Sequence, residues 1–202
     1  MWGLVESGSI TKLINKPKAM VIGDVRYSRK IFELWSKSEL EAIGIYEVET
    51  DNTNFKNNKW YINTDESYTF GSGKVTRAWG TATAKAHADT LYTEQNKTDN
   101  EIPDGKDVGD VAVKGLKTVL IEDIKKQAAG ILQDTDWYIV RKADAGTAVP
   151  SSITTHRAAV RTKAAEQETA ITNAADTPAL ETLYTRNEDG VRPLGDLPVL
   201  EV

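Results

Sequence analysis

Residues 111–132 read VAVKGLKTVLIEDIKKQAAGIL, and their apolar positions recur with the period of an α-helix. These positions follow i, i+3, i+4 spacing, while the lysines fall mostly elsewhere on the helical wheel; the apolar set is Leu116, Val119, Leu120, Ile124, Ala128, Ile131 and Leu132. Gly115 weakens the start of this helix, and the run Asp134-Thr135-Asp136-Trp137 ends it. The stretch therefore predicts that the second half of the chain is helical.

Two further helices are expected after this one. Ala143–Pro150 is a loop of small residues, and Pro150-Ser151-Ser152 opens a helix with serine as its cap. The inner face of that helix is rich in alanine and buries little surface, so the helix needs a partner to persist. Thr177-Pro178 begins a third helix, with Thr177 as N-cap and Pro178 at the first helical position. The segment 187–202 is expected to be an extended tail that docks onto another surface.

The first half of the chain is predicted to consist mainly of short strands. Two pairs of apolar runs flank glycine-containing turns and indicate β-hairpins; they are Trp2–Glu6 with Ile10–Ile14, and Met20–Ile22 with Val25–Tyr27. Between Arg29 and Gly44 the pattern becomes helical, with Ser36 and Ser38 as candidate N-caps and Gly44 just beyond the helix. Further strands are predicted over 45–49, 59–63 and 74–83.

The best candidate for a domain boundary is Glu94–Asp110, EQNKTDNEIPDGKDVGD. Its single isolated isoleucine, its proline and its mixed charges cannot offset the entropy of ordering, so we predict a flexible linker. The expected fold class is α+β. A small β-rich domain with short helices covers residues 1–93, the linker 94–110 follows, and a helical hairpin or three-helix unit covers 111–186, before the tail 187–202.

Composition excludes several classes of function. The 202 residues are 40% hydrophobic and 27% charged, which suits one ordinary domain or two small ones. A net charge of −5 argues against binding nucleic acid through its phosphates. The chain has no cysteine, and its two histidines, His87 and His156, lack metal-ligand spacing, so no metal or cofactor is predicted. No apolar run approaches the roughly 18–20 residues of a membrane span, and the N-terminus is too polar for a secretory signal.

The sequence shows no arrangement of catalytic residues, and we expect the protein not to be an enzyme. Neither histidine lies in a nucleophile elbow or a local triad. The carboxylate pairs Glu39/Glu41 and Asp134/Asp136 suit helix ends better than acid–base chemistry. A glycan-cleaving enzyme, the remote alternative, would need two acids about 5–10 Å apart in a cleft, and nothing points to such a pair.

Three arginines of the C-terminal half stand near these acidic residues. Arg157 and Arg161 are spaced i, i+4 and project from one helical face, and Arg141 follows Trp137 by four residues. Arginine pairs bidentately with carboxylates, so an internal network that joins the helix break to the next helix is the favoured interpretation. The rival interpretation is an interaction patch for an acidic or aromatic partner.

Two parts of the chain resemble a family of tail proteins from tailed bacteriophages. The runs 131–141, ILQDTDWYIVR, and 153–161, ITTHRAAVR, with Val149-Pro150 between them, are similar to the C-terminal region of that family. Its pattern is a helix ending in Leu, then Thr-Asp-Trp, then Arg, then a Pro-led helix with two arginines four residues apart. Residues 31–45, IFELWSKSELEAIGI, resemble the N-terminal domain that often accompanies it. Together these segments cover about a third of the chain; 59–83, the linker and the tail lie outside the pattern.

The family includes tail-fibre assembly proteins, tail assembly chaperones and small tail-associated proteins. The resemblance implies a non-enzymatic structural component of the tail, such as an adaptor, connector or fibre-associated subunit. It would be made in the bacterial cytoplasm and held in the virion by other tail proteins, as a symmetric oligomer or as tail-attached copies. The alternative is an assembly chaperone that is absent from the mature virion. No catalytic residue is transferred by the pattern; the residues expected to fix the C-terminal fold or to make contacts are Asp136, Trp137, Arg141, Pro150, Arg157 and Arg161.

Overall fold

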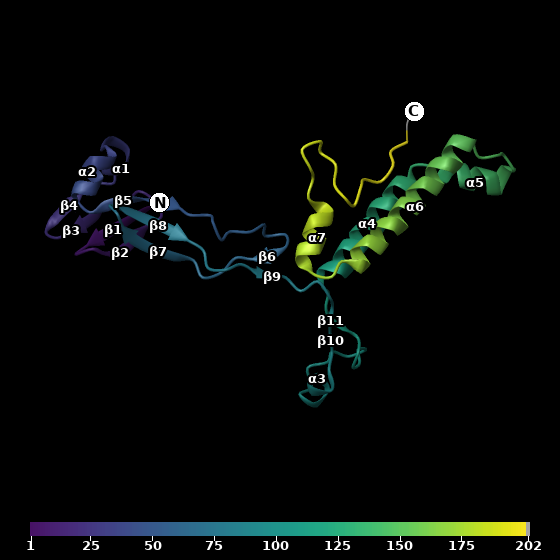
Figure 1. The fold of residues 1–202 in the computed structure, drawn as a ribbon, viewed down its shortest axis with the longest axis horizontal. Coiled ribbons are helices and arrows are strands. Elements are labelled where there is room, and N and C mark those ends of the chain that lie inside the picture. The colour runs from purple at the N-terminus through teal and green to yellow at the C-terminus, as the bar shows by residue number, and fades with distance from the viewer. Residues whose placement is uncertain (201–202) are drawn as a thin grey trace. The chain divides into compact units, whose positions relative to one another are not determined.

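The computed structural model describes residues 1–200 and has the expected α+β class, with a β-rich first part and a helical second part (Figure 1). The chain divides into two compact units, unit 1 covering Met1–Thr83 and unit 2 beginning at Ala84. The division therefore falls before the predicted linker at 94–110 rather than within it.

Unit 1 is built on a five-stranded sheet with the strand order β2-β1-β5-β8-β7. All neighbouring strands are antiparallel except β5 and β8, which run parallel. The edge strands β2 and β7 also contact each other, so the sheet curls. The elements of unit 1 in chain order are β1 (Trp2–Glu6), β2 (Ser9–Ile14), β3 (Met20–Ile22), β4 (Val25–Tyr27), α1 (Ile31–Leu34), α2 (Lys37–Ala42), β5 (Ile45–Thr50), β6 (Tyr61–Ile62), β7 (Ser67–Gly71) and β8 (Lys74–Ala78). The short strand β9 (Thr83–Ala84) follows at the end of the unit and pairs with β6.

Both predicted hairpins of unit 1 are present, β1 with β2 and β3 with β4. Of the two candidate caps, Ser36 caps α2: its hydroxyl accepts from the backbone N–H of Glu39, whose carboxylate accepts in turn from the N–H of Ser36. The strand expected over 59–63 is limited to β6, and that over 74–83 is split into β8 and β9.

Helices α1 and α2 cover one face of the curled sheet and enclose the core of unit 1. The chain leaves α2 through Gly44 at φ 83°, where a Cβ would lie 2.6 Å from the carbonyl oxygen of Val5, so only glycine fits. The N–H of Val5 donates to the carbonyl of Gly44, which ties this turn to the sheet. The buried core side chains are Leu4, Ile14, Met20, Ile31, Leu40 and Ile45.

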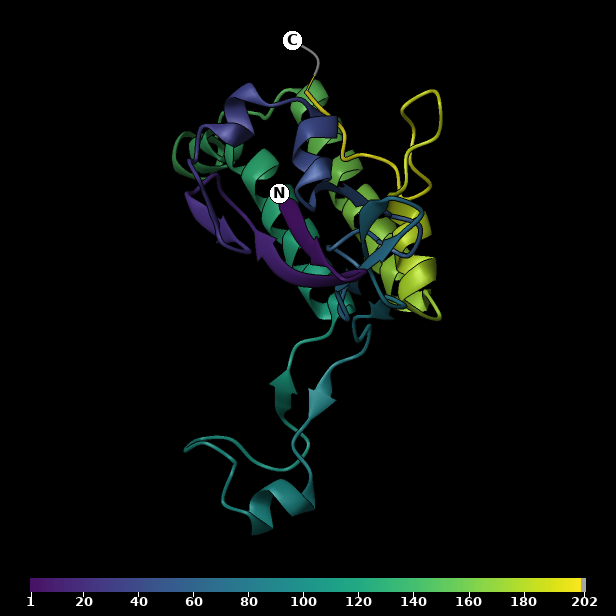
Figure 2. The same ribbon diagram turned by 90° about the vertical axis from the view of Figure 1, so that its left-hand side faces the viewer.

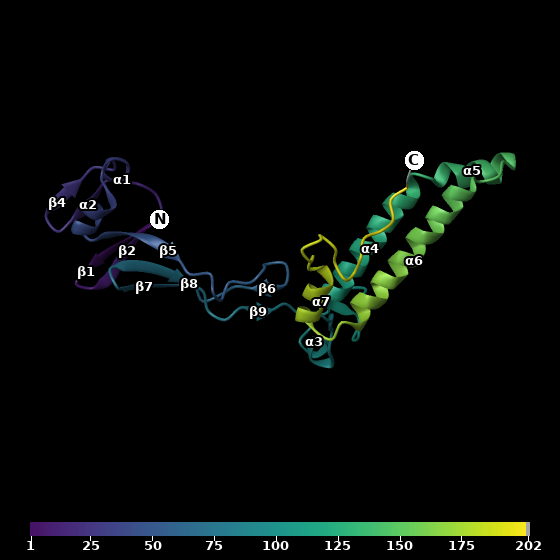
Figure 3. The same cartoon turned by 45° about the horizontal axis from the view of Figure 1, so that its top comes forward.

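Unit 2 is a helical hairpin with a β-hairpin arm at its base. Helices α4 (Leu116–Gln133) and α6 (Ser151–Asn173) lie side by side along their length (Figure 3). They are antiparallel, since the Lys117 ammonium near the start of α4 donates to the carbonyl of Thr172 near the end of α6. Apolar side chains from both helices fill the seam between them; these are Leu120, Ile124 and Ala128 with Ile153, Val160, Ala164 and Ile171.

The arm projects away from the helices (Figure 2) and consists of β10 (Thr90–Leu91), α3 (Glu94–Thr98) and β11 (Val111–Val113). The predicted start of the helix near Val111 is wrong, because β11 pairs with β10 and α4 begins only at Leu116. The segment 94–110 is thus the tip of a hairpin inside unit 2 and does not join the two units. Its predicted flexibility stays a prediction.

Contacts distant in sequence close the base of the helical hairpin. The Asp89 carboxylate accepts from the N–H of Gly115 at 2.7 Å and from the Thr118 hydroxyl at 2.8 Å, where α4 begins. The buried hydroxyl of Thr177 donates to the carbonyl of Lys85 at 2.6 Å. Residues 85–89 therefore belong to unit 2, and the predicted boundary after residue 93 would cut through its packing.

Two helix starts differ from the sequence prediction by one residue. Helix α7 (Thr177–Tyr184) is capped by Asp176, whose carboxylate accepts from the N–H of Ala179 at 2.8 Å, so Thr177 is the first helical residue. The N-cap of α6 is Pro150, and neither Ser151 nor Ser152 makes a capping hydrogen bond. Pro150 instead sets an extended backbone just before the helix.

The described part of the predicted tail folds back onto unit 2. Leu194 is buried, its N–H donates to the carbonyl of Leu183, and the Gln167 side-chain amide donates to the carbonyl of Gly195 at 2.9 Å. Asp196 bridges Arg186 and Arg192 and completes this loop. Residues 201 and 202 of the predicted tail lie outside the described residues.

Candidate functional site

Arg157 is the centre of the internal network predicted for the C-terminal unit. Its side chain is only 9% exposed. It donates from Nη1 to the carbonyl of Leu132 at 2.6 Å and to the hydroxyl of Thr135 at 2.7 Å, and it pairs through Nη2 with Asp136 at 2.8 Å. One buried guanidinium thus binds the end of α4 and the beginning of the next helix, α5 (Asp136–Ala145). The prediction of a network that joins the helix break to the following helix is confirmed for Arg157 and Asp136.

The other two arginines lie outside that network. Arg161 is exposed and reaches only the carbonyl of Arg157, one turn back on its own helix. Arg141 lies over two aromatic rings, 4.6 Å from the centroid of Trp137 and 5.4 Å from that of Tyr138. Its buried Nε has no hydrogen-bond partner within residues 1–200. Arg141 therefore holds the aromatic pair by cation–π contact and does not bind a carboxylate there.

Trp137 does not fix the fold as a core residue, because its side chain is 51% exposed. Helix α5 was not predicted, and it explains this exposure. Its first turn follows the helix break directly, and none of its ten residues is buried against the rest of the described chain. Trp137 packs on the half-buried Tyr138 with the ring centroids 3.9 Å apart.

Helix α5 carries an exposed apolar surface, which we call the α5 surface and define as Trp137, Ile139 and Val140. These side chains are 51%, 43% and 65% exposed. On the helical wheel Val140 falls between Trp137 and Ile139, so the three side chains share one side of α5, and Lys142 falls on the opposite side. Exposed aromatic and aliphatic groups gathered on one element mark a surface that another protein covers. The α5 surface is the strongest candidate contact site in unit 2.

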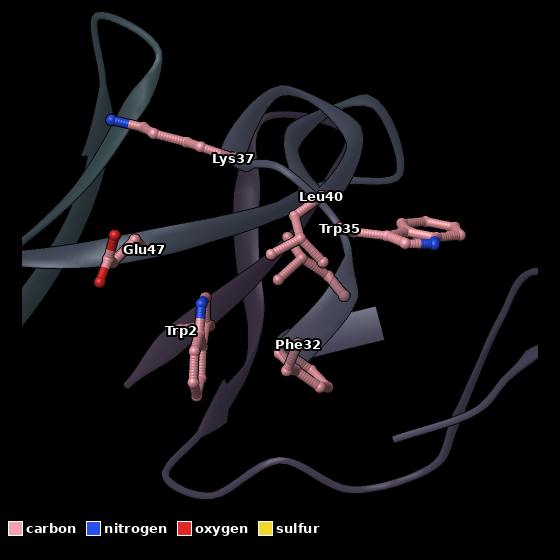
Figure 4. Close-up of a pocket in the computed structure, with 7 residues that line it drawn as sticks. Trp2, Phe32, Trp35, Lys37, Leu40 and Glu47 are labelled. Atoms are coloured by element: carbon pink, nitrogen blue, oxygen red, sulfur yellow. The ribbon is translucent and has the colours of Figure 1, made fainter. Parts of the chain in front are cut away.

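Unit 1 holds a second candidate site, a cavity of about 200 Å³ at the edge of the helical cover (Figure 4). Leu40 and Ile45 form its buried floor. Trp2, Phe32 and Trp35 are half-buried around it, and Lys37 and Glu47 are exposed at its rim. Sequence analysis missed this site; the signal that could have found it is strand alternation, which places Trp2 and Glu47 on the same face as the core.

The described residues contain no group of three or more histidine, aspartate or glutamate side chains placed to hold a metal ion. Across residues 1–200, none of the helices combines the length and the apolar character needed to cross a membrane.

No family model, curated protein or solved structure matches this chain.

Proposed function

We propose that this chain is a non-enzymatic structural component of a bacteriophage tail, held in the virion by contacts with other tail proteins. The observation that carries the protein-binding part is the α5 surface, which lies on a helix with no buried residue of its own. The assignment to a phage tail rests on the resemblance of residues 131–161 and 31–45 to tail proteins.

The network at Arg157 supports this proposal. It anchors the first residue of α5 to α6 through a buried guanidinium, so the helix is held in a fixed orientation although none of its residues is fully buried. Arg141 stacks on Trp137 and Tyr138 and orders the two largest side chains before any partner binds. Ordering a binding surface in advance reduces the entropy lost on association.

The test is incorporation of variants into particles of a phage that lacks its own copy of the gene. Val140→Glu places a charge in the centre of the α5 surface, and Ala158→Glu places the same charge on an exposed position of α6. We expect Ala158→Glu to be incorporated like the unmodified protein and Val140→Glu to fall about tenfold or more, as for a contact worth at least ~1.4 kcal/mol. The copy number in purified particles, measured by quantitative mass spectrometry, gives the result.

Equal incorporation of Val140→Glu and Ala158→Glu would show that α5 is not the contact surface. A chain that is abundant in infected cells but absent from particles, in all versions, would identify the alternative, an assembly chaperone.

A further inference from the structure

The cavity of unit 1 is independent of the α5 surface and has a distinct chemistry. Its walls include two aromatic rings in contact, Trp2 and Phe32, with centroids 4.8 Å apart and planes inclined by 54°. Trp2 of β1 lies directly opposite Glu47 of β5 in the sheet register, and both face the side that α1 and α2 cover. Figure 4 shows Trp2 between Phe32 on one side and Glu47 on the other. One side of the indole therefore contacts the Phe32 ring, and the other side is directed toward the Glu47 carboxylate.

Glu47 differs from the other glutamates around it in its partners. Glu49 on the same strand pairs with Lys74, Glu41 pairs with Lys37, and Glu33 pairs with Arg29. The carboxylate of Glu47 makes no ion pair with any group in residues 1–200. Glu47 is thus the acidic residue of the lining, and it is left without an ion pair there.

Lys37, the other charged residue of the lining, makes no ion pair with that carboxylate. Its ammonium is directed to Glu41, 3.8 Å away on α2, and in Figure 4 the side chain extends away from Trp2 and Phe32. Glu47 is therefore the acidic group of the lining that lies beside the indole.

We propose that this cavity binds a cationic side chain, a lysine or arginine presented by a partner protein. The aliphatic stem would lie on the floor made by Leu40 and Ile45, which matches the way such stems cover apolar surface. The charged head would lie between the free side of the Trp2 ring and the Glu47 carboxylate. There it gains a cation–π contact and an ion pair together, and tryptophan is the best ring for the former. A volume of about 200 Å³ suits one side chain rather than a larger ligand.

The test uses the full chain and two blocked tripeptides, acetyl-Ala-Lys-Ala-amide and acetyl-Ala-norleucine-Ala-amide. Norleucine keeps the stem and lacks the charge, so the pair isolates the contribution of the cation. The readout is the indole N–H resonance of Trp2 in a nitrogen–proton NMR spectrum, assigned from its disappearance in Trp2→Phe. We expect saturable shifts of this resonance with the lysine peptide, with a Kd on the order of 1 mM, and at least about fivefold weaker binding of the norleucine peptide.

Variants separate the site from the general charge of the protein. Glu47→Gln removes the rim carboxylate, and Glu33→Gln makes the same change on α1 outside the cavity. We expect Glu47→Gln to lose most of the preference for the lysine peptide, keeping only the part due to the cation–π contact, and Glu33→Gln to bind both peptides like the unmodified chain. Equal binding of the two peptides, equal effects of the two variants, or an unshifted Trp2 resonance up to about twenty times the expected Kd would each overturn the proposal.

Discussion

Arg157 is the residue on which the placement of α5 depends most strongly. A single buried guanidinium satisfies the carbonyl at the end of α4 and the carboxylate at the beginning of α5. Removal of the guanidinium is costly because hydrogen bonds to a charged donor are lost, although the Thr135 hydroxyl and N–H still donate to the Leu132 carbonyl. The Asp136 carboxylate is itself 54% exposed, so the cost lies mainly with Leu132 and Thr135 rather than with the ion pair.

We predict that Arg157→Met destabilises unit 2 by about 1.5–3 kcal/mol, because the Leu132 carbonyl and the Thr135 hydroxyl lose a charged donor while they keep the hydrogen bond to each other. Arg161→Met, one turn along the same helix and exposed, serves as the control and should change stability by no more than about 0.5 kcal/mol. Urea denaturation followed by circular dichroism measures both. Equal losses in the two variants would contradict the role assigned to Arg157.

Trp137→Ala should cost no more than about 1.5 kcal/mol of unfolding free energy, because its ring is half exposed, whereas a fully buried tryptophan costs about 3–5 kcal/mol. The helical signal of the variant should match that of the unmodified chain before denaturation. A loss near 4 kcal/mol would show that the indole is packed in solution, and the α5 surface would then lose its largest member.

At the scale of elements, the parts that sequence could predict are those set by local patterns. The two N-terminal hairpins follow from alternation around short turns, and the α4–α6 pair follows from the helical period of residues 111–132 and 153–174. Helix α5 escaped prediction because Trp-Tyr-Ile-Val has no helical period. Its orientation is fixed by Arg157, a residue of another helix. The cavity of unit 1 was not predicted because its lining comes from four elements, β1, α1, α2 and β5, that are brought together only by the fold.

The start of α4 is held by Asp89 and gives a pH-dependent prediction. Hydrogen bonds from the N–H of Gly115 and the hydroxyl of Thr118 hold the pKa of the Asp89 carboxyl below its usual value. A pKa that is lower in the folded state stabilises the fold fully above the unfolded value of about 3.9, and this stabilisation is lost as the pH falls through the folded pKa.

Asp89→Asn should therefore be less stable than the unmodified chain at pH 7, and its unfolding free energy should fall less steeply between about pH 5 and pH 2. Asp144→Asn, the same change at an exposed position of α5, is the matched control and should change the stability at pH 7 by no more than about 0.5 kcal/mol. Denaturant titrations at several pH values provide the comparison. Parallel pH profiles for Asp89→Asn and the unmodified chain would refute the capping role of Asp89.

At the scale of the whole molecule, the chain is two units rather than two domains joined by the segment 94–110. The low apolar content of that segment is typical of a linker, but composition cannot distinguish a linker from the tip of a hairpin arm. The strands on either side of it pair with each other. What ties residues 85–89 to unit 2 is a set of hydrogen bonds to Gly115, Thr118 and Thr177, and no local pattern signals them.

The fragments 1–83 and 84–202 should each fold alone, and their circular dichroism spectra should sum to that of the full chain. The fragment 94–202 lacks the Asp89 and Lys85 contacts and should unfold at a clearly lower urea concentration than 84–202. Equal urea midpoints for the fragments 84–202 and 94–202 would place the boundary after residue 93, as the sequence predicted.

The central claim is that the chain is a part of the phage tail, and the most direct test is quantitative mass spectrometry of purified intact particles. We predict that the chain is present in a fixed copy number that is a multiple of three or six, as expected of a symmetric tail component. Its absence from particles, with abundance in the lysate of infected cells, would contradict the claim and assign the protein to tail assembly instead.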